Sequence, residues 1–226
     1  MSDRDDAPMD ALFQQIRASK AAEATTLLTE DAPHIQARQR RIARHKARAA
    51  QTPSRVDDAP QGHGPTNRHG MPAVPIGQRV VRKWPILDLG VTPKVDAQSW
   101  RLRVDGAVEQ AIELDMSSLR ALPQVEDISD FHCVTTWSKL DMRWRGVQVS
   151  TVLALAGLTA EATHLMCHGY DGYTTNVSIE EAVKDDVLLV HTWEDAPLPF
   201  EHGGPVRMIT PQLYAWKGSK WISRIE

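Results

Sequence analysis

Cysteine is scarce in this chain, which has only Cys133 and Cys167 among its 226 residues. Two cysteines are too few for the disulfide framework of a small secreted domain. They form no CxxC pair, so the usual patterns of structural zinc sites and redox-active dithiols are absent, and no CxxCH is present for a c-type haem. The sequence therefore favours a reducing compartment, in which each cysteine is a single thiol.

Long hydrophobic runs are missing as well. No uninterrupted apolar segment has the length of a signal-peptide core or of a membrane span. Arg40 and Arg41 are followed by polar residues, whereas a twin-arginine signal requires an apolar segment at that place. We therefore expect a soluble, cytoplasmic protein that does not act at a membrane.

Charge of one sign is not in large excess, because 26 Lys and Arg face 29 Asp and Glu, for a formal net charge of -3. The basic run from Arg38 to Arg48 lacks the interleaved aromatic residues that are typical of nucleic-acid binding. A solvated helix is the favoured interpretation of this run, and a nucleic-acid partner is not expected. Neither GxGxxG nor a Walker loop occurs, so a nucleotide-binding fold has no support.

The chain divides into two parts near residue 77. In the first part, the spacing of Met9, Leu12, Phe13 and Ile16 predicts amphipathic helices, and frequent proline and glycine from about 52 to 77 predict a linker without regular structure. We expect an N-terminal helical, basic extension with a Pro/Gly-rich linker over 1–77. One globular domain, long enough to bury a sizeable core, is expected over 78–226.

Short strands dominate the second part. Trp100, Leu102 and Val104 alternate with polar residues before Gly106, and a similar alternation over 112–116 predicts the second strand of a hairpin. Further strands are expected at 164–166, 187–193 and 206–210, and short helices are expected after the candidate N-caps Asp115, Ser150 and Ser178. These patterns predict an α+β fold of mixed, mostly antiparallel β-sheets with short helices.

The stretch from Asp130 to Leu140 is the first candidate site. It places Cys133 directly after His132 and near Thr135 and Lys139. A thiolate, rather than a thiol, binds metals or attacks electrophiles, and neighbouring His and Lys favour the ionised form. The alternative, a buried cysteine that acts as a small hydrophobic residue, is equally compatible with this stretch alone.

Glycines and cations gather near the C-terminus in two clusters, over 202–207 and 217–220. Arg207 offers a planar guanidinium for a phosphate, Lys217 and Lys220 add point charges, and the glycines allow close approach of the backbone. This combination is typical of an anion-binding loop. A surface turn with solvated cations explains the same residues.

Four segments together resemble one known family. They are His-Cys-Val-Thr-Thr-Trp-Ser-Lys at 132–139, Trp-Pro-Ile-Leu-Asp-Leu-Gly at 84–90, Gly-Tyr-Thr-Thr-Asn at 172–176, and His-Gly-Gly-Pro-Val-Arg at 202–207 with Tyr-Ala-Trp-Lys at 214–217. They are similar to motifs of the molybdopterin-binding domain of sulfite oxidase-like oxidoreductases and stand in that family's order. The resemblance runs from about residue 78 to 226, and residues 1–77 do not share it.

The resemblance implies a domain that holds one Mo-molybdopterin, with Cys133 as the thiolate ligand of molybdenum. It implies transfer of an oxygen atom to or from a small sulfur-containing substrate, of the sulfite or sulfoxide type, and a separate electron-transfer partner. The domain is expected to be short at its C-terminal end relative to the family. Carried over by position, the expected cofactor-binding residues are Trp84, His132, Thr135, His168, His202, Arg207, Lys217, Ser219 and Lys220.

The residues themselves favour one thiolate per metal ion. Adjacent side chains in a strand point to opposite faces, so His132 and Cys133 would not both bind one ion, and neither would Cys167 and His168. A cofactor that completes the ligand set fits this pattern better. The alternatives are a zinc-binding or structural protein that uses these residues with His202, a catalytically silent binding module, and a hydrolase with Cys133 as nucleophile.

Overall fold

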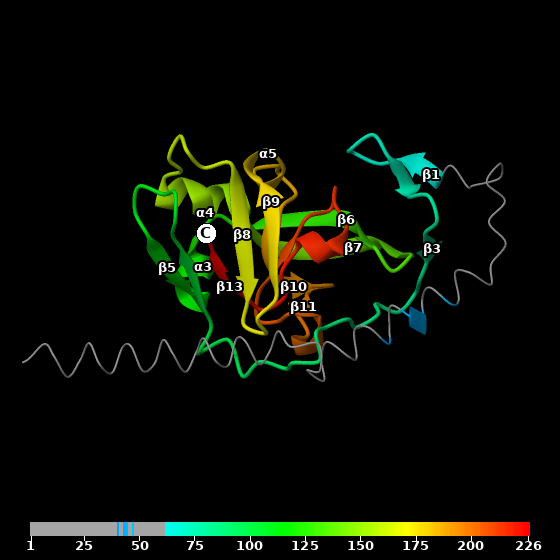
Figure 1. Ribbon diagram of the computed structural model, residues 1–226, viewed down its shortest axis with the longest axis horizontal. Coiled ribbons are helices and arrows are strands. Elements are labelled where there is room, and N and C mark those ends of the chain that lie inside the picture. The colour runs from blue at the N-terminus through cyan, green and yellow to red at the C-terminus, as the bar shows by residue number, and fades with distance from the viewer. Residues whose placement is uncertain (1–39, 41–42, 45–46, 48–61) are drawn as a thin grey trace, which may run out of the picture. The chain divides into compact units, whose positions relative to one another are not determined.

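The structure is a computed structural model that describes residues 40, 43, 44, 47 and 62–226 (Figure 1). The predicted helices of the N-terminal extension lie outside the described residues, except for four positions between 40 and 47 that are helical. Residues 62–88 and 92–226 belong to one compact unit, which contains the site and the sheets that support it. Within the described residues, no helix combines the length and the apolar character that crossing a bilayer requires.

Strands make up most of the described secondary structure. The strands are β1 (His63–Thr66), β2 (Pro72–Val74), β3 (Arg79–Val80), β4 (Arg101–Val104), β5 (Ile112–Asp115), β6 (Val125–Cys133), β7 (Trp137–Gln148), β8 (His164–Gly169), β9 (Thr174–Ser178), β10 (Leu188–Trp193), β11 (Ala196–Pro197), β12 (Arg207–Ile209) and β13 (Ile222–Ile225). The helices are α3 (Met116–Ala121), α4 (Val149–Ala156) and α5 (Ile179–Ala182), with 3-10 turns η2 (Phe200–His202) and η3 (Ala215–Lys217).

The strands form three sheets (Figure 1). One sheet runs in the order β11-β10-β7-β3, with β6 paired to β7 and β12 paired to β10, and a second runs β5-β4-β13-β8-β9. The third contains only β1 and β2. Every pairing is antiparallel except β3 with β7 and β13 with β4. The predicted α+β class, with mixed and mostly antiparallel sheets and short helices, is confirmed.

The predicted hairpin of the second sheet is present. β4 and β5 pair with Arg101 opposite Asp115, and β4 buries Leu102 and Val104 while its arginines face solvent. The Asp115 carboxylate accepts from the backbone N–H of Ser118, so Asp115 is the N-cap of α3 as predicted. Met116 begins this helix instead of extending β5. The predicted cap at Ser150 is wrong, because Ser150 lies inside α4, which begins at Val149 and has no side-chain cap.

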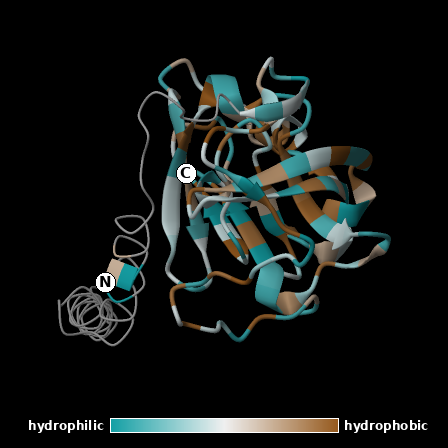
Figure 2. Cartoon of the chain, turned by 90° about the vertical axis from the view of Figure 1, so that its right-hand side faces the viewer, coloured by the Kyte–Doolittle hydropathy of each residue, from teal (hydrophilic) through white to brown (hydrophobic). Residues whose placement is uncertain are grey.

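The long β6–β7 hairpin was not among the predicted strands. Its first half carries polar residues at most positions, so it lacks the apolar alternation that identifies a strand. Tertiary packing supplies what the local pattern does not, because β7 lies between β6 and β10 and is paired to both. Figure 2 shows hydrophobic and polar bands alternating along the strands, as expected for strands with one face on a core.

Two hydrophobic clusters stabilise this unit. The larger packs β4, β5, β8 and β13 against α3 and α4, and it includes Trp100, whose indole N–H donates to the Ile222 carbonyl at 2.8 Å. The smaller is rich in aromatic residues and lies along the first sheet, and Cys133 belongs to it. The members of the smaller cluster are Trp84, Phe131, Cys133, Trp137, Met142, Trp144, Leu188, Val190, Leu198 and Ile209.

The described part of the predicted linker has regular structure, contrary to expectation. β1 and β2 pair antiparallel, with His63 opposite Val74. Pro72 stands at the first position of β2, where its missing N–H costs little, and Gly70 takes a positive φ of 77° in the connecting turn. Proline and glycine therefore shape this hairpin instead of preventing it. The domain boundary at residue 77 stays a prediction.

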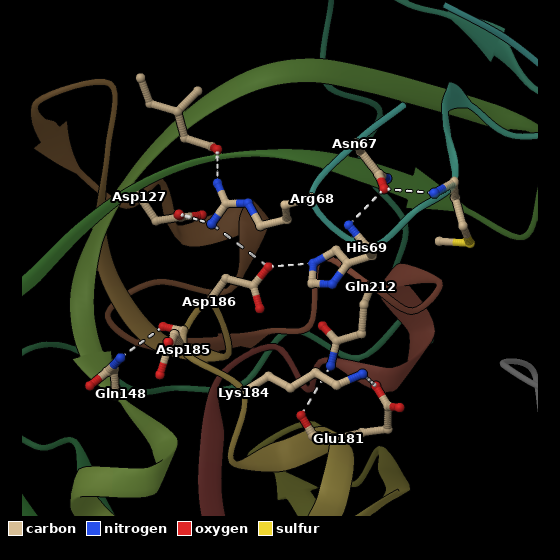
Figure 3. Close-up of polar contacts among 12 residues, drawn as sticks. Asn67, Arg68, His69, Asp127, Gln148, Glu181, Lys184, Asp185, Asp186 and Gln212 are labelled. Carbon is tan, nitrogen blue, oxygen red and sulfur yellow. Dashed lines mark hydrogen bonds and ion pairs between the residues drawn. The ribbon is translucent and has the colours of Figure 1, made fainter. Parts of the chain in front are cut away.

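Ionic contacts hold the β1–β2 turn against the domain (Figure 3). Arg68 donates to the Asp127 carboxylate and to the Ile128 carbonyl, both at 2.6 Å. His69 Nε2 lies 2.6 Å from the carboxylate of Asp186, a residue that is only 2% exposed. Asp127 is largely buried as well, and Arg68 also lies 3.9 Å from the Asp186 carboxylate, so both acids depend on this turn for their partners.

Replacing Arg68 by Met is expected to destabilise the protein by about 1–3 kcal/mol, because the largely buried Asp127 loses its partner. Hydrogen exchange should become faster over residues 63–74. Chemical denaturation and exchange mass spectrometry would measure both effects. The control is Arg145→Met, which breaks a solvent-exposed pair with Glu126 and is expected to cost at most about 1 kcal/mol. Equal losses in the two variants would contradict the role of Arg68.

Candidate functional site

Cys133 ends strand β6 and places its thiol in the aromatic cluster. The residue is 7% exposed, and its sulfur lies 3.1 Å from the hydroxyl of Thr135. The following turn puts Thr136 in the left-handed region, at a φ of 72°. The Cys133 carbonyl accepts two hydrogen bonds, from the backbone N–H of Thr136 at 3.0 Å and from the side-chain amide of Gln78 at 3.1 Å. No signal in the sequence indicated Gln78.

Arg207 begins strand β12 and is almost completely buried, at 4% exposure. Its guanidinium donates to the carbonyl of His202 at 2.9 Å and lies over the rings of Phe131 and Trp84, 4.9 and 5.5 Å from their centroids. Within the described part of the chain, no carboxylate forms an ion pair with it. Burial lowers the pKa of Arg207 to about 9, and the nearby Cys133 acts in the opposite direction.

His202 and Trp84 form a stacked pair beside Arg207. Their ring centroids are 3.8 Å apart with an angle of 2° between the planes. Burial, followed by the charge of Arg207, lowers the pKa of His202 to about 4, so its ring is neutral near pH 7. The structure thus brings Trp84, from the motif at 84–90, against His202 and Arg207, from the motif at 202–207.

Lys220 adds a second cation to this group. Its ammonium donates to the Leu87 carbonyl at 3.0 Å and lies 4.2 Å from the ring centroid of Trp221. Burial and the charge of Arg207 lower the pKa of Lys220 to about 8, partly opposed by Asp88 and Asp171. Two partly desolvated cations that repel each other favour the binding of an anion between or beside them.

The glycines of the two C-terminal clusters have a different role from the one predicted. A Cβ on Gly204 would lie 2.2 Å from the Leu198 carbonyl oxygen, and one on Gly218 would lie 2.3 Å from the Met208 carbonyl oxygen. These glycines therefore allow neighbouring backbone segments to pack together. The cations that could bind an anion here are the buried side chains of Arg207 and Lys220.

Two other predicted residues support this region from behind. Ser219 is fully buried, and its hydroxyl donates to the Lys220 carbonyl at 3.2 Å. Lys217 donates to the backbone and side-chain oxygens of Asn176, at 2.9 and 2.7 Å. This contact joins η3 to β9, so two of the predicted motifs meet there. The Lys217 ammonium is engaged by Asn176, and its expected place at a phosphate stays a prediction.

His168 and Cys167 lie on β8, in the second sheet. His168 Nε2 is 3.5 Å from the Glu226 carboxylate. Cys167 is fully buried beside Met208, and burial raises the pKa of its thiol to about 12. Among the residues that the structure describes, no three His, Cys, Asp or Glu side chains come together in a way that could hold a metal ion. The zinc-binding alternative therefore finds no support in the geometry.

The donor set fits a cofactor that carries both a phosphate and a metal ion. Arg207 and Lys220 are desolvated cations, and the flat Trp84–His202 pair offers an aromatic surface. Cys133 offers a single sulfur, so a metal ion bound at this thiol would need further ligands from the cofactor. The buried indole N–H of Trp193, beside Trp84, is a hydrogen-bond donor that has no partner in the part of the chain that the structure describes.

Comparison with known proteins identifies such a family. The family described as oxidoreductase molybdopterin binding domain matches residues 89–226. The chain belongs to this family. It is a molybdenum cofactor-dependent oxidoreductase of the sulfite oxidase-like type, and its cofactor is Mo-molybdopterin, as the resemblance of the motifs implied.

Three relatives illustrate the range of the similarity. "Uncharacterized oxidoreductase YuiH" of Bacillus subtilis is 36% identical over 154 residues, which cover 68% of this chain and 78% of that protein. The protein-methionine-sulfoxide reductase catalytic subunit MsrP of Gluconobacter oxydans is 28% identical, over 56% of this chain and 46% of its own. Human mitochondrial sulfite oxidase is 26% identical, over 59% and 30% respectively. The chain thus spans less than half of the two relatives whose names state a reaction.

A solved structure supports the fold class. The sulfane dehydrogenase SoxCD from Paracoccus pantotrophus has a TM-score of 0.55 against this chain, with 24% sequence identity. The similarity covers 59% of this chain and 39% of that one. The likeness concerns the arrangement of sheets and short helices only.

Replacing Lys220 by Met is expected to weaken cofactor retention roughly tenfold, because a charge-assisted contact to the phosphate is lost. Molybdenum per chain and pterin fluorescence after denaturation would measure the loss. The matched variant is Lys217→Met, which removes a cation that the protein already binds through Asn176 and is expected to keep its cofactor. A loss of similar size in Lys217→Met would place both lysines at the phosphate, as the sequence alone predicted.

Proposed function

We propose that this protein uses its molybdenum cofactor to transfer an oxygen atom to or from a small sulfur-containing substrate, with Cys133 as the thiolate ligand. The observation that carries the proposal is the pairing of a buried single thiol with a buried, carboxylate-free guanidinium. The thiol of Cys133 is close enough to Arg207 to raise the pKa of its guanidinium, against the effect of burial.

Each residue of the site has a distinct task in this proposal. Arg207 and Lys220 bind the phosphate, and their burial strengthens that contact because water competes less for the charges. The stacked pair of Trp84 and His202 orients the flat part of the cofactor. When bound, the cofactor supplies the two-electron redox chemistry, while the protein supplies placement and electrostatics.

Two further predicted residues, Thr135 and His168, lie in different parts of the fold. Thr135 lies within contact of the Cys133 sulfur, at 3.1 Å, and is placed to orient it. His168 has the Glu226 carboxylate as its neighbour, on the second sheet. A role for His168 at the pterin therefore depends on a contact made through the cofactor itself.

Names of relatives support sulfur as the reacting element of the substrate. One relative is named for the reduction of methionine sulfoxide and another for the oxidation of sulfite. Both reactions move one oxygen atom and two electrons, so both require a second protein or small molecule that accepts or donates electrons. We propose a separate electron-transfer partner, since the sequence carries no CxxCH haem signature, and a cytoplasmic location, since its two cysteines are free thiols.

Replacing Cys133 by Ser is expected to remove the sulfur-to-metal charge-transfer absorption of the loaded protein, because hydroxyl oxygen is a harder ligand than thiolate. The pterin should be retained through Arg207 and Lys220. Absorption and paramagnetic resonance spectra of the Mo(V) state would measure the change. Cys167→Ala is the control, since that thiol lies buried beside Met208 and is expected to leave both spectra unchanged. An unchanged spectrum in Cys133→Ser would remove Cys133 as the ligand.

Turnover of a sulfur substrate is expected in one of two assays on the fully loaded protein. The first is oxidation of sulfite with ferricyanide as electron acceptor, and the second is reduction of methionine sulfoxide with a reduced viologen as donor. Activity in either assay should disappear in Cys133→Ser. The absence of turnover in both assays, at full molybdenum content, would contradict the proposed substrate class.

A further inference from the structure

A small cavity lies behind the hairpin end that carries Cys133. Its volume is about 10 Å³, and it is enclosed by β6, β12 and the loop that leads to η3. Three of its lining residues are polar and buried, namely Ser129, His132 and Thr210. Each of them has a buried side-chain atom that finds no hydrogen-bond partner among the described residues: Ser129 Oγ, His132 Nε2 and Thr210 Oγ1.

The size and lining of this cavity match one water molecule. A cavity needs roughly 10–15 Å³ of space for a probe the size of water, together with two to four polar partners, to hold an ordered water. The three unpartnered atoms provide that number of partners. Leaving all three atoms unsatisfied would destabilise the folded protein, so an occupied cavity is the more stable arrangement.

The other nitrogen of His132 begins a hydrogen-bond chain. Its Nδ1 lies 2.8 Å from the hydroxyl of Ser138, a residue with no exposed surface, and this hydroxyl donates to Gln78 Oε1 at 3.3 Å. Because the Ser138 proton is used toward Gln78, Ser138 accepts from Nδ1–H. In the neutral ring, Nε2 then carries a lone pair, which requires a donor such as water.

The chain ends on the backbone of Cys133. Gln78 Nε2 donates to the Cys133 carbonyl at 3.1 Å. This oxygen can only accept, so the orientation of the Gln78 amide is fixed and its own oxygen must face Ser138. The same carbonyl accepts from Thr136 N–H, whose residue takes the left-handed backbone conformation of the turn. The four polar groups therefore have one consistent set of donors and acceptors.

We propose that a buried water, His132, Ser138 and Gln78 form a relay that positions the turn carrying Cys133. These are positioning residues, because each acts through the next and the last acts on the Cys133 carbonyl. Cys133, in contrast, is the proposed metal ligand. The functional meaning of the relay rests on the proposed ligation by Cys133. Partners that orient a metal ligand commonly set its direction and electronic character. The relay also gives His132 a role that differs from a contact to the cofactor.

Replacing Gln78 by Met in the metal-free full-length protein is expected to speed hydrogen exchange of the Thr136 amide by about tenfold, because the shared carbonyl loses its second donor. The rate of alkylation of Cys133 should rise with it. The matched control is Gln124→Met. Gln124 likewise joins a side chain to a backbone carbonyl, in its case those of His191 and Leu119, and it precedes the end of β6 that lies away from Cys133. An equal response in both variants, or none in Gln78→Met, would overturn the relay.

Two substitutions of His132 separate its two nitrogens. The amide nitrogen of Asn can take the place of Nδ1 and keep the bond to Ser138, whereas Gln reaches the cavity but loses that bond. His132→Asn is therefore expected to retain slow exchange at Thr136, and His132→Gln is expected to lose it. A high-resolution crystal structure should show a water within hydrogen-bonding distance of His132, Ser129 and Thr210. An empty cavity, or one filled by an atom of the cofactor, would contradict the relay.

The loaded protein separates failure of the relay from failure of the proposed function. Gln78→Met should shift the Mo(V) resonance and the charge-transfer band, while Gln124→Met should not. If the wild-type protein shows no such band, Cys133 is not the ligand, and the exchange results on metal-free protein still decide the relay. If the band is present and Gln78→Met leaves both the band and the exchange rates unchanged, the relay is wrong and the proposed ligation stands.

Discussion

The burial of the Arg207 guanidinium without a carboxylate is the constraint on which the rest of the site depends. Removing a cation from water costs several kcal/mol in a folded protein. Carbonyl groups and the π faces of Phe131 and Trp84 recover part of this cost. An anionic ligand recovers more of it. If Arg207 binds the cofactor phosphate as proposed, the same charge destabilises the empty domain and anchors the cofactor, so that folding of this region and cofactor binding are coupled.

The sheet order explains how distant motifs reach this cation. β12 carries Arg207 beside β10, β10 pairs with β7, and β7 forms the hairpin with β6, which ends at Cys133. The rings of the β6–β7 hairpin and the Trp84–His202 stack then enclose the guanidinium. Side chains from paired strands of one sheet, and not neighbours in sequence, surround the Cys133 thiol and the Arg207 guanidinium. Both groups therefore lie in an environment of low dielectric constant.

Much of the site was predictable because motif residues carry their chemistry in their side chains. Cys133, His202, Arg207 and Lys220 do gather in one place. The contact between Lys217 and Asn176 was not predictable, because the two residues are distant in sequence and only the packing of η3 against β9 joins them. The β6–β7 hairpin was missed for a related reason: its strands follow tertiary pairing and lack a local pattern. Gln78 gave no signal, since a single glutamine after a Pro/Gly-rich stretch is typical of a surface turn.

The positions of Gln78 and Trp84 bear on where the functional unit begins. The family match starts at residue 89, yet the stacked partner of His202 is Trp84 and the donor to the Cys133 carbonyl is Gln78. β3, between these two residues, pairs with the start of β7 directly after the Cys133 turn. A segment that precedes the matched region is therefore built into the walls of the site. Variation in this segment can change the environment of the thiol without any change in the motifs that define the family.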